Sequence, residues 1–172
     1  MHCSCIHCLN KLLFQFYPPY VSTLTQTRID FTNPILLGIS SSNINKLQRV
    51  QNCLARVVLL DQSSPSLLSQ LHWLPLPKRI DFKIATLTYQ SVTFGQPTYL
   101  SSLLTPYQPH RSLRSASQNL LTVPRCISSF FGQRSFSYSA PRIWNDLPLA
   151  VRQSPSLNSF KRNLKTYYFA SQ

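Results

Sequence analysis

The densest group of residues that could do chemistry lies at the start of the chain, where histidine and cysteine crowd together. These potential metal ligands are His2, Cys3, Cys5, His7 and Cys8. A structural zinc site needs four such ligands at spacings that let one ion be enclosed tetrahedrally. Here they are too close together for one loop to do so, and Cys53 and Cys126 stand alone without a partner pair. We therefore expect no metal site and no cofactor.

Carboxylates are too sparse for an enzymatic site. The acidic residues are four aspartates: Asp30, Asp61, Asp81 and Asp146. No two are adjacent, so general acid–base and two-metal chemistry lack paired carboxylates. His72, His110 and many serines occur, but no acid stands near them to orient a base. With only 3 glycines there is no glycine-rich phosphate loop either. We expect no enzyme and no small-molecule substrate.

The basic residues offer a different chemistry, the binding of a polyanion. Lys and Arg number 17 against 4 acids, which gives a net charge of +13 and a pI near 10.0. A lysine or arginine that meets a phosphate releases counterions, so RNA or DNA is the expected partner. The predicted nucleic-acid contacts are a stripe at Arg49 and Arg56, a cluster at Lys78, Arg79 and Lys83, a loop pair at Arg111 and Arg114, and a helix face at Lys161, Arg162 and Lys165.

Each of these groups has an alternative role in which it binds no ligand. The stripe at Arg49 and Arg56 could simply be solvated, and Lys78 and Arg79 could pair with Asp81 or with solvent. Aromatic residues near the basic ones could stack on bases. Among them we expect Trp144 and Phe136 in the core, and Tyr107 and Tyr167 on the surface.

Hydrophobic periodicity and capping signals predict the helices that carry these groups. Helices are expected at 43–60, from 64 to before Pro75, at 77–92, at 98–104 and at 156–169, with a helical turn inside 140–147. The helix at 77–92 is apolar on two faces, and such a helix is packed on two sides. Its stripes are Ile80, Ile84 and Leu87, and Phe82, Ala85, Tyr89 and Val92. We expect it at the centre of the core.

The expected fold is therefore mainly α. A bundle-like helical region at 21–105 is followed by a basic, loop-rich segment at 106–172 with short strands and a terminal helix, while 1–20 is expected to be disordered. Leu120 to Val123 and Phe136 to Tyr138 are typical of short strands or extended segments, bounded by Pro124, Gly132 and Pro141.

Targeting and membrane signals are weak. The start of the chain lacks the pattern of a signal peptide, and the odd number of cysteines favours a reducing compartment. The uncharged stretch at 84–110 is rich in Gln, Pro, Ser and Thr, which excludes a membrane-spanning helix. We expect an intracellular protein of the nucleus or cytoplasm, not secreted and not in a membrane.

Three blocks of sequence point to a family. The first runs from Arg28-Ile29-Asp30-Phe31-Thr32-Asn33 to Asn45-Lys46-Leu47-Gln48-Arg49, and the second joins Leu71-His72-Trp73-Leu74-Pro75 to Arg79-Ile80-Asp81-Phe82-Lys83. The third joins Arg111-Ser112-Leu113-Arg114 to Ala140-Pro141-Arg142-Ile143-Trp144-Asn145-Asp146-Leu147-Pro148 and to Ser159-Phe160-Lys161. Over about residues 21–169, the chain resembles the C-terminal tail of the endonuclease/reverse-transcriptase polyprotein of non-LTR retrotransposons, the LINE elements.

This resemblance implies a fragment without catalysis. The region corresponds to the thumb and beyond, whereas the family's metal-binding F/Y-A-D-D motif and its endonuclease lie earlier and have no match here. Thumb helices grip the template–primer backbone, so the basic faces are implied contacts for RNA or DNA without sequence preference. Asp30 and Asp81 are expected in caps or in salt bridges with Arg28, Arg79 or Lys83. Alternatively, the helices at 43–60 and 77–92 dock on the missing polymerase core or on a host protein, with no nucleic-acid role.

Overall fold

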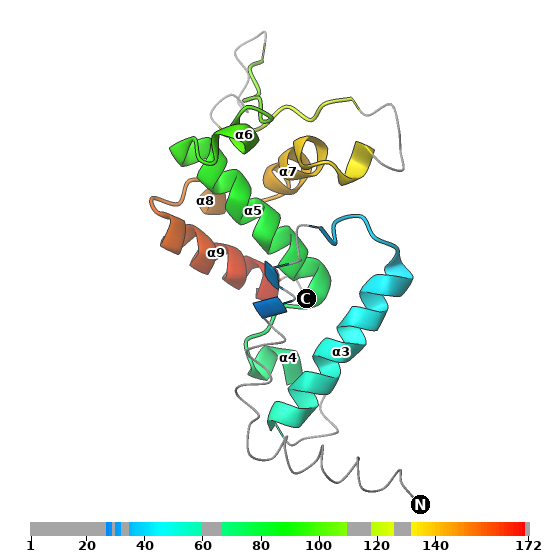
Figure 1. Cartoon of the computed structure of the whole chain (residues 1–172). Helices are drawn as coiled ribbons and strands as arrows, with labels where there is room; N and C mark the ends of the chain where they lie inside the picture. The colour runs from blue at the N-terminus through cyan, green and yellow to red at the C-terminus, as the bar shows by residue number, and fades with distance from the viewer. Residues whose placement is uncertain are drawn as a thin grey trace, which may run out of the picture.

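The structure of the chain is a computed structural model that describes residues 27–28, 30–31, 35–59, 67–109, 118–125 and 132–170. This part is mainly helical, as the sequence predicts (Figure 1). Its elements are α3 (Ser41–Leu59), α4 (Leu67–Gln70), α5 (Leu76–Phe94), α6 (Thr98–Ser101), the 3-10 turn η1 (Gly132–Arg134), α7 (Phe136–Asn145), α8 (Leu149–Arg152) and α9 (Leu157–Ala170). Within the described ranges, no helix combines the length and apolar character needed to cross a membrane.

Helix α5 is the element on which the others pack. Pro77 lies in its first turn, where a missing N–H costs nothing, and Gly95 ends it at a φ of 66° in the left-handed region. Figure 1 shows α5 in the middle of the described helices. Helices α7 and α9 lie against it, and α3 lies at its N-terminal end. The expectation of a central helix packed on two sides is confirmed, but Val92 of the predicted second stripe lies beyond the packed part of α5 and is 43% exposed.

Each face of α5 contributes to a separate apolar cluster. On one side Leu76, Ile80 and Ile84 pack with Ala140 of α7, and partly buried residues of α3 cover them. The larger cluster, on the other side, contains Leu74, Ala85, Tyr89, Leu121, Trp144, Leu147, Val151, Phe160, Leu164 and Tyr168. Each cluster contains residues from both predicted segments, 21–105 and 106–172. The two segments are therefore packed together through α5.

Three aromatic rings form the centre of the larger cluster. Tyr89 of α5 stacks on Phe160 of α9 with ring centroids 4.4 Å apart, and Trp144 of α7 lies 6.0 Å from Phe160. The two polar atoms of the group are satisfied, because the Tyr89 hydroxyl donates to the Ser154 carbonyl at 2.7 Å and Trp144 Nε1 donates to the Asn119 carbonyl at 2.7 Å. Trp144 is thus a core residue, as the sequence predicts.

The prediction of short strands is wrong for the described residues. Phe136 to Tyr138 form the first turn of α7, and Leu121 makes only an isolated antiparallel bridge with Pro106. Aromatic residues alternate with serine from Phe136 to Ser139, which is the pattern of a strand. Pro141 is typical of the end of an element, but here it lies inside the helix. The helical spacing of Ala140 and Trp144, both buried on α5, outweighs that local signal. Phe136 is half-buried against the smaller cluster.

The segment around Leu121 is held by side chains of α7 and by two backbone hydrogen bonds, from the Tyr107 N–H to the Leu120 carbonyl at 2.9 Å and from the Thr122 N–H to the Thr105 carbonyl at 2.8 Å. The Asn145 side-chain amide makes two hydrogen bonds with the backbone of Leu121. Its Oδ1 accepts from the Leu121 N–H at 2.9 Å, and its Nδ2 donates to the Leu121 carbonyl at 2.8 Å. Together with the bond from Trp144, this pins the segment in an extended conformation. The expectation of an extended segment is therefore confirmed there, with α7 and residues 105–107 as its partners.

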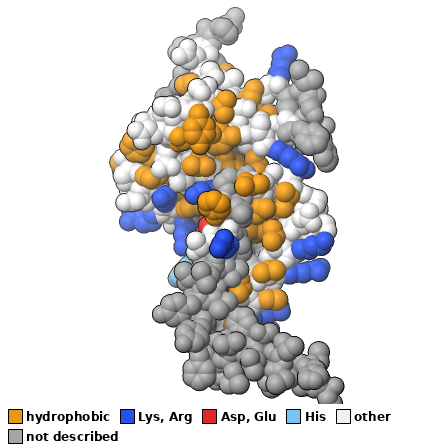
Figure 2. Space-filling view, viewed as in Figure 1, with side chains coloured by type: hydrophobic (Ala, Val, Ile, Leu, Met, Phe, Trp, Pro, Cys, Tyr) orange, Lys and Arg blue, Asp and Glu red, His pale blue; other side chains and the backbone are white. Residues whose placement is uncertain are grey.

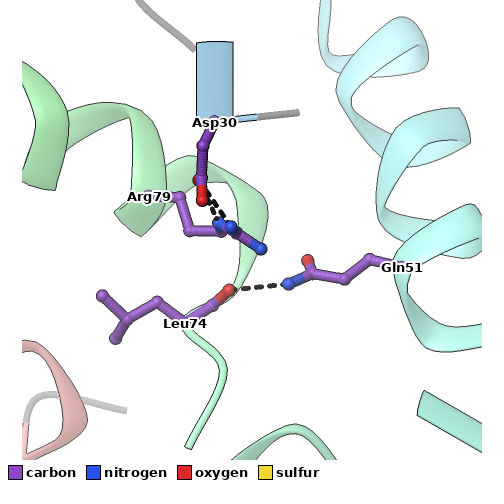
Figure 3. Close-up of polar contacts among 4 residues, drawn as sticks. All are labelled: Asp30, Gln51, Leu74 and Arg79. Atoms are coloured by element: carbon purple, nitrogen blue, oxygen red, sulfur yellow. Dashed lines mark hydrogen bonds and ion pairs between the residues drawn. The ribbon is translucent and has the colours of Figure 1, made fainter. Parts of the chain in front are cut away.

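Two glutamines attach α3 to the body. Gln51 is fully buried and donates its Nε2 to the Leu74 carbonyl at 2.9 Å (Figure 3). Gln48 Oε1 accepts from the Leu76 N–H at 2.8 Å, one of the N–H groups that the start of α5 leaves unpaired, and its Nε2 donates to Gln51 Oε1. These bonds fix α3 against the connector between α4 and α5.

Replacing Gln51 by alanine should destabilise the fold, because the Leu74 carbonyl would stay buried without its donor. We expect Gln51→Ala to lower the free energy of unfolding by about 1–3 kcal/mol in urea denaturation. Asn45→Ala, an exposed change on the same helix, should shift it by less than about 0.5 kcal/mol. Equal stability of Gln51→Ala and the wild type would contradict this role.

Candidate nucleic-acid interface

Two of the four predicted basic groups meet at one groove between α5 and α9. The groove has a volume of about 650 Å³ and is lined by Lys83 from α5 and by Lys161 and Lys165 from α9. All three lysines are exposed. Lys161 and Lys165 are four residues apart, which places them on the same flank of their helix. The fold thus brings separate parts of the sequence into one basic site.

The connector between α4 and α5 forms the floor of this groove. His72 and Trp73 line it together with the apolar side chains of Leu74, Phe82 and Leu87. His72 has a φ of 53°, a left-handed conformation that is uncommon outside glycine. It results from the closure of α4, where the Trp73 N–H donates to the Leu68 carbonyl at 2.8 Å as in a Schellman motif. That turn directs the chain from α4 into the groove floor.

Arg79, the first predicted contact that the structure reassigns, is held by an acid. Its Nε donates to Asp30 Oδ1 at 3.1 Å and a second bond runs from Nη2 to the same oxygen (Figure 3). The Arg79 side chain is 12% exposed while Asp30 is 54% exposed. The expected salt bridge between Asp30 and Arg79 is confirmed, and Arg79 contributes little net charge to the groove that it borders.

Lys78 also lies apart from the groove lining. Its ammonium sits 5.1 Å from the centroid of the Tyr168 ring, a cation–π contact at the edge of the core. Burial raises the pKa of the Asp81 carboxyl and the charge of Lys78 partly opposes that rise, so Lys78 interacts with Asp81 and with Tyr168 of its own chain.

The remaining predicted contacts are dispersed. Arg49 and Arg56 are exposed on α3, and Arg162 is exposed on α9 but is not part of the groove lining. Arg111 and Arg114 lie outside the described residues. Figure 2 shows the basic side chains on the α3 side and on the α9 side of the molecule, with hydrophobic side chains between them. Among the residues that the structure describes, the groove is the place where members of more than one predicted group come together.

The aspartates take up structural positions near α7. Asp81 and Asp146 line a second cavity, of about 490 Å³, together with Arg134 and Arg142. Burial raises the pKa of the Asp81 carboxyl above its ordinary value, Lys78 opposes the rise and Asp146 adds to it. Burial, reinforced by Asp81, likewise raises the pKa of Tyr168. With two arginines facing two aspartates, this cavity has no excess of either charge.

Arg152, which the sequence did not single out, is the one buried cation among the described residues. It lies at the end of α8 and its side chain is 7% exposed. Its Nε and Nη1 are buried and donate to no acceptor in the part of the chain that the structure describes. Burial accordingly lowers its pKa. One of the 17 positive charges is therefore unavailable to a partner.

Several sequence predictions concern residues that do not enter the groove. Tyr107 is 42% exposed, as predicted, whereas Tyr167 is half-buried against the core. Cys53 is a free, exposed thiol on α3. Over the described ranges no three His, Cys or acidic side chains gather as metal ligands, and the cluster from His2 to Cys8 lies outside those ranges.

Comparisons with known proteins add no family to this picture. The chain matches no protein-family model, no curated protein and no solved structure.

Trp73 and His72 are the groove residues that sequence reasoning missed. Their signal was present in the run Leu71-His72-Trp73-Leu74-Pro75, which contributes to the resemblance but carries no charge.

The pKa of Asp81 predicts how stability depends on pH. Because the folded state binds this proton more tightly than the unfolded state does, the penalty for its charge is absent below the unfolded pKa near 4 and appears as pH rises through the folded pKa. Asp81→Asn should therefore be more stable than the wild type at pH 7. The difference should shrink as the pH is lowered towards 4 in urea denaturation series. A difference that stays constant with pH would rule out this linkage.

Arg152, whose buried Nε and Nη1 have no acceptor among the described residues, predicts a stabilising substitution. Methionine keeps a flexible, unbranched apolar side chain, shorter than that of arginine, and removes a buried charge, a change that is often neutral or stabilising by about 1–4 kcal/mol. We expect Arg152→Met to keep or raise the free energy of unfolding. The matched change Arg142→Met removes an exposed guanidinium 5.7 Å from the Tyr138 ring and should lower stability by up to about 1 kcal/mol. A clear loss of stability in Arg152→Met would show that its guanidinium is satisfied.

Proposed function

We propose that this chain binds RNA or DNA through the sugar–phosphate backbone, without sequence preference and without catalysis. The observation that carries the proposal is the convergence of Lys83, Lys161 and Lys165 on the groove between α5 and α9. The acid that borders this groove, Asp30, is already paired with Arg79. Three solvated ammonium groups on two rigid helices therefore face a polyanion with no competing carboxylate among the groove's other lining residues.

The strength of such binding follows from counterion release. Each phosphate neutralised changes the logarithm of the affinity by about −0.9 per logarithm of salt concentration on duplex DNA and about −0.7 on single strands. Three lysine contacts correspond to a slope of roughly −2 to −3. Lysines suit this task because a phosphate contacted as a point charge carries no sequence information.

The resemblance to the tail of LINE-type reverse transcriptases supports the same proposal. From the second of the matching blocks, the residues that line the groove include His72, Trp73, Leu74, Arg79 and Lys83. In this interpretation the chain is a non-catalytic fragment of a LINE-type reverse transcriptase, acting in the nucleus or cytoplasm. The polymerase core from which such a fragment derives is then a further candidate partner.

A second candidate function, docking on another protein, is favoured by an apolar surface at the other end of α5. Val92, Phe94, Tyr99 and Leu103 are all exposed, with Tyr99 at 69%. Figure 2 shows hydrophobic side chains gathered at the end of the molecule that carries α6 in Figure 1. Exposed apolar clusters of this kind are typical of interaction surfaces.

Removing the charges of the groove should weaken binding selectively. We expect the triple variant Lys83→Gln, Lys161→Gln and Lys165→Gln to bind a fluorescent oligonucleotide roughly 10- to 100-fold more weakly at 50 mM salt in anisotropy titrations, and to show a salt slope shallower by about 2 to 3.

A matched triple variant separates the groove from net charge alone. Lys46→Gln, Arg49→Gln and Arg56→Gln remove the same charge from exposed positions on α3. This protein should keep its affinity within about threefold, because general attraction at a distance is screened by salt. If both triples lose affinity equally, the groove is not the site, and if the wild type binds no nucleic acid at low salt the proposed function is wrong.

A further inference from the structure

The groove has a feature that contact with a phosphate backbone does not require, namely an aromatic and apolar floor. Trp73 is half-buried there, beside Leu74, Phe82 and Leu87, while the three lysines stand at its edge. His72 lies next to Trp73 and meets Phe169 of α9 edge to face, with ring centroids 6.5 Å apart. A basic rim around an aromatic floor is the combination that binds single-stranded nucleic acids.

Trp73 is held firmly on both sides along the chain. Its own N–H is bonded to the Leu68 carbonyl at the end of α4, and the carbonyl of the next residue, Leu74, accepts from buried Gln51. Pro75 then leads directly into α5. A platform fixed in this way loses little conformational entropy when a ligand stacks on it.

One polar side chain in the groove is available to a base. Thr86 Oγ1 is already committed to the Phe82 carbonyl at 2.7 Å. Gln90, one turn further along α5, lines the groove and makes no hydrogen bond to any side chain or backbone group that the structure describes. Its amide can both donate and accept, so it suits the edge of any base and selects none strongly.

We propose, resting on the function proposed above, that the groove binds single-stranded RNA or DNA by stacking an unpaired base on Trp73. Lys83, Lys161 and Lys165 hold the phosphates on either side of that base. A duplex keeps its bases stacked and paired inside, so it reaches only the lysines and cannot use the floor. The preference for single strands therefore comes from Trp73, and the affinity common to both forms comes from the lysines.

The chain contains its own reporter for this contact. Its two tryptophans are Trp73 and Trp144, and Trp144 is 1% exposed with its Nε1 bonded to the Asn119 carbonyl. A ligand in the groove therefore changes the fluorescence of Trp73 alone. Titrating the full chain with a 15-nucleotide oligo-dT or oligo-U should quench the emission, and a blunt mixed-sequence duplex of equal length should bind without quenching it.

Two substitutions test the role of the ring. Stacking on an aromatic side chain is worth about 1–3 kcal/mol per base, so Trp73→Ala should weaken single-strand binding roughly 5- to 100-fold and leave duplex binding within about twofold. Trp73→Phe keeps an aromatic face and should recover most of the lost affinity. If circular dichroism shows that Trp73→Ala does not fold, two other measurements test the stacking of a base on Trp73. These are the quenching of the wild-type fluorescence by single strands and the affinity of Trp73→Phe for single strands and for the duplex.

The outcomes separate this inference from the function on which it rests. Salt-dependent binding without quenching, or equal affinity of wild type and Trp73→Ala for single strands, would overturn the base-stacking site and leave backbone binding standing. A duplex bound as tightly as a single strand would do the same. Failure of both forms to bind at 50 mM salt would overturn the proposed function and this inference together.

Discussion

The whole structure depends on the burial of α5 on two faces. One helix of 19 residues separates two apolar clusters, and helices from both ends of the sequence have to meet it. The stack of Tyr89 on Phe160 with Trp144 beside it sets how closely α7 and α9 approach α5. Because both faces are occupied by apolar neighbours, the charged residues of α5 are restricted to the narrow sectors between them. The groove is one of these sectors, so its position follows from the core.

Much of the fold could be predicted from the sequence, because its long helices carry clear periodic signals. The structure places α3, α5 and α9 within two residues of their predicted ends, which Ser, Pro and Gly mark by local backbone preference. Helix α7 was partly missed, since its first turn alternates like a strand and a proline follows inside it. Whether such a segment is helical depends on its burial against α5, which is a tertiary effect.

The site was predictable in its parts and not in its assembly. Lys83 and Lys161 each appeared as members of basic groups, but nothing in the sequence says that α5 and α9 lie side by side in that register. Nor could charge counting show that Asp30 engages Arg79 or that Arg152 is buried, because both depend on contacts between distant segments. Trp73 was not predicted as a binding residue. A single aromatic residue before a helix that begins with proline can lie in the core or in a binding site, and the sequence does not distinguish the two.

The attachment of α3 has a consequence for how this sequence can change over time. Gln51 binds the backbone carbonyl of Leu74 and Gln48 binds the backbone N–H of Leu76, so neither bond depends on the side chains of the connector. Mutation of the connector can therefore alter the groove floor while α3 keeps its place. The two glutamines themselves tolerate substitution poorly. Their bonds need a side chain of this length with an amide that both donates and accepts, and no shorter or charged residue makes the same pair of bonds. Substitutions should therefore accumulate in the side chains that line the groove sooner than in the two glutamines that hold α3.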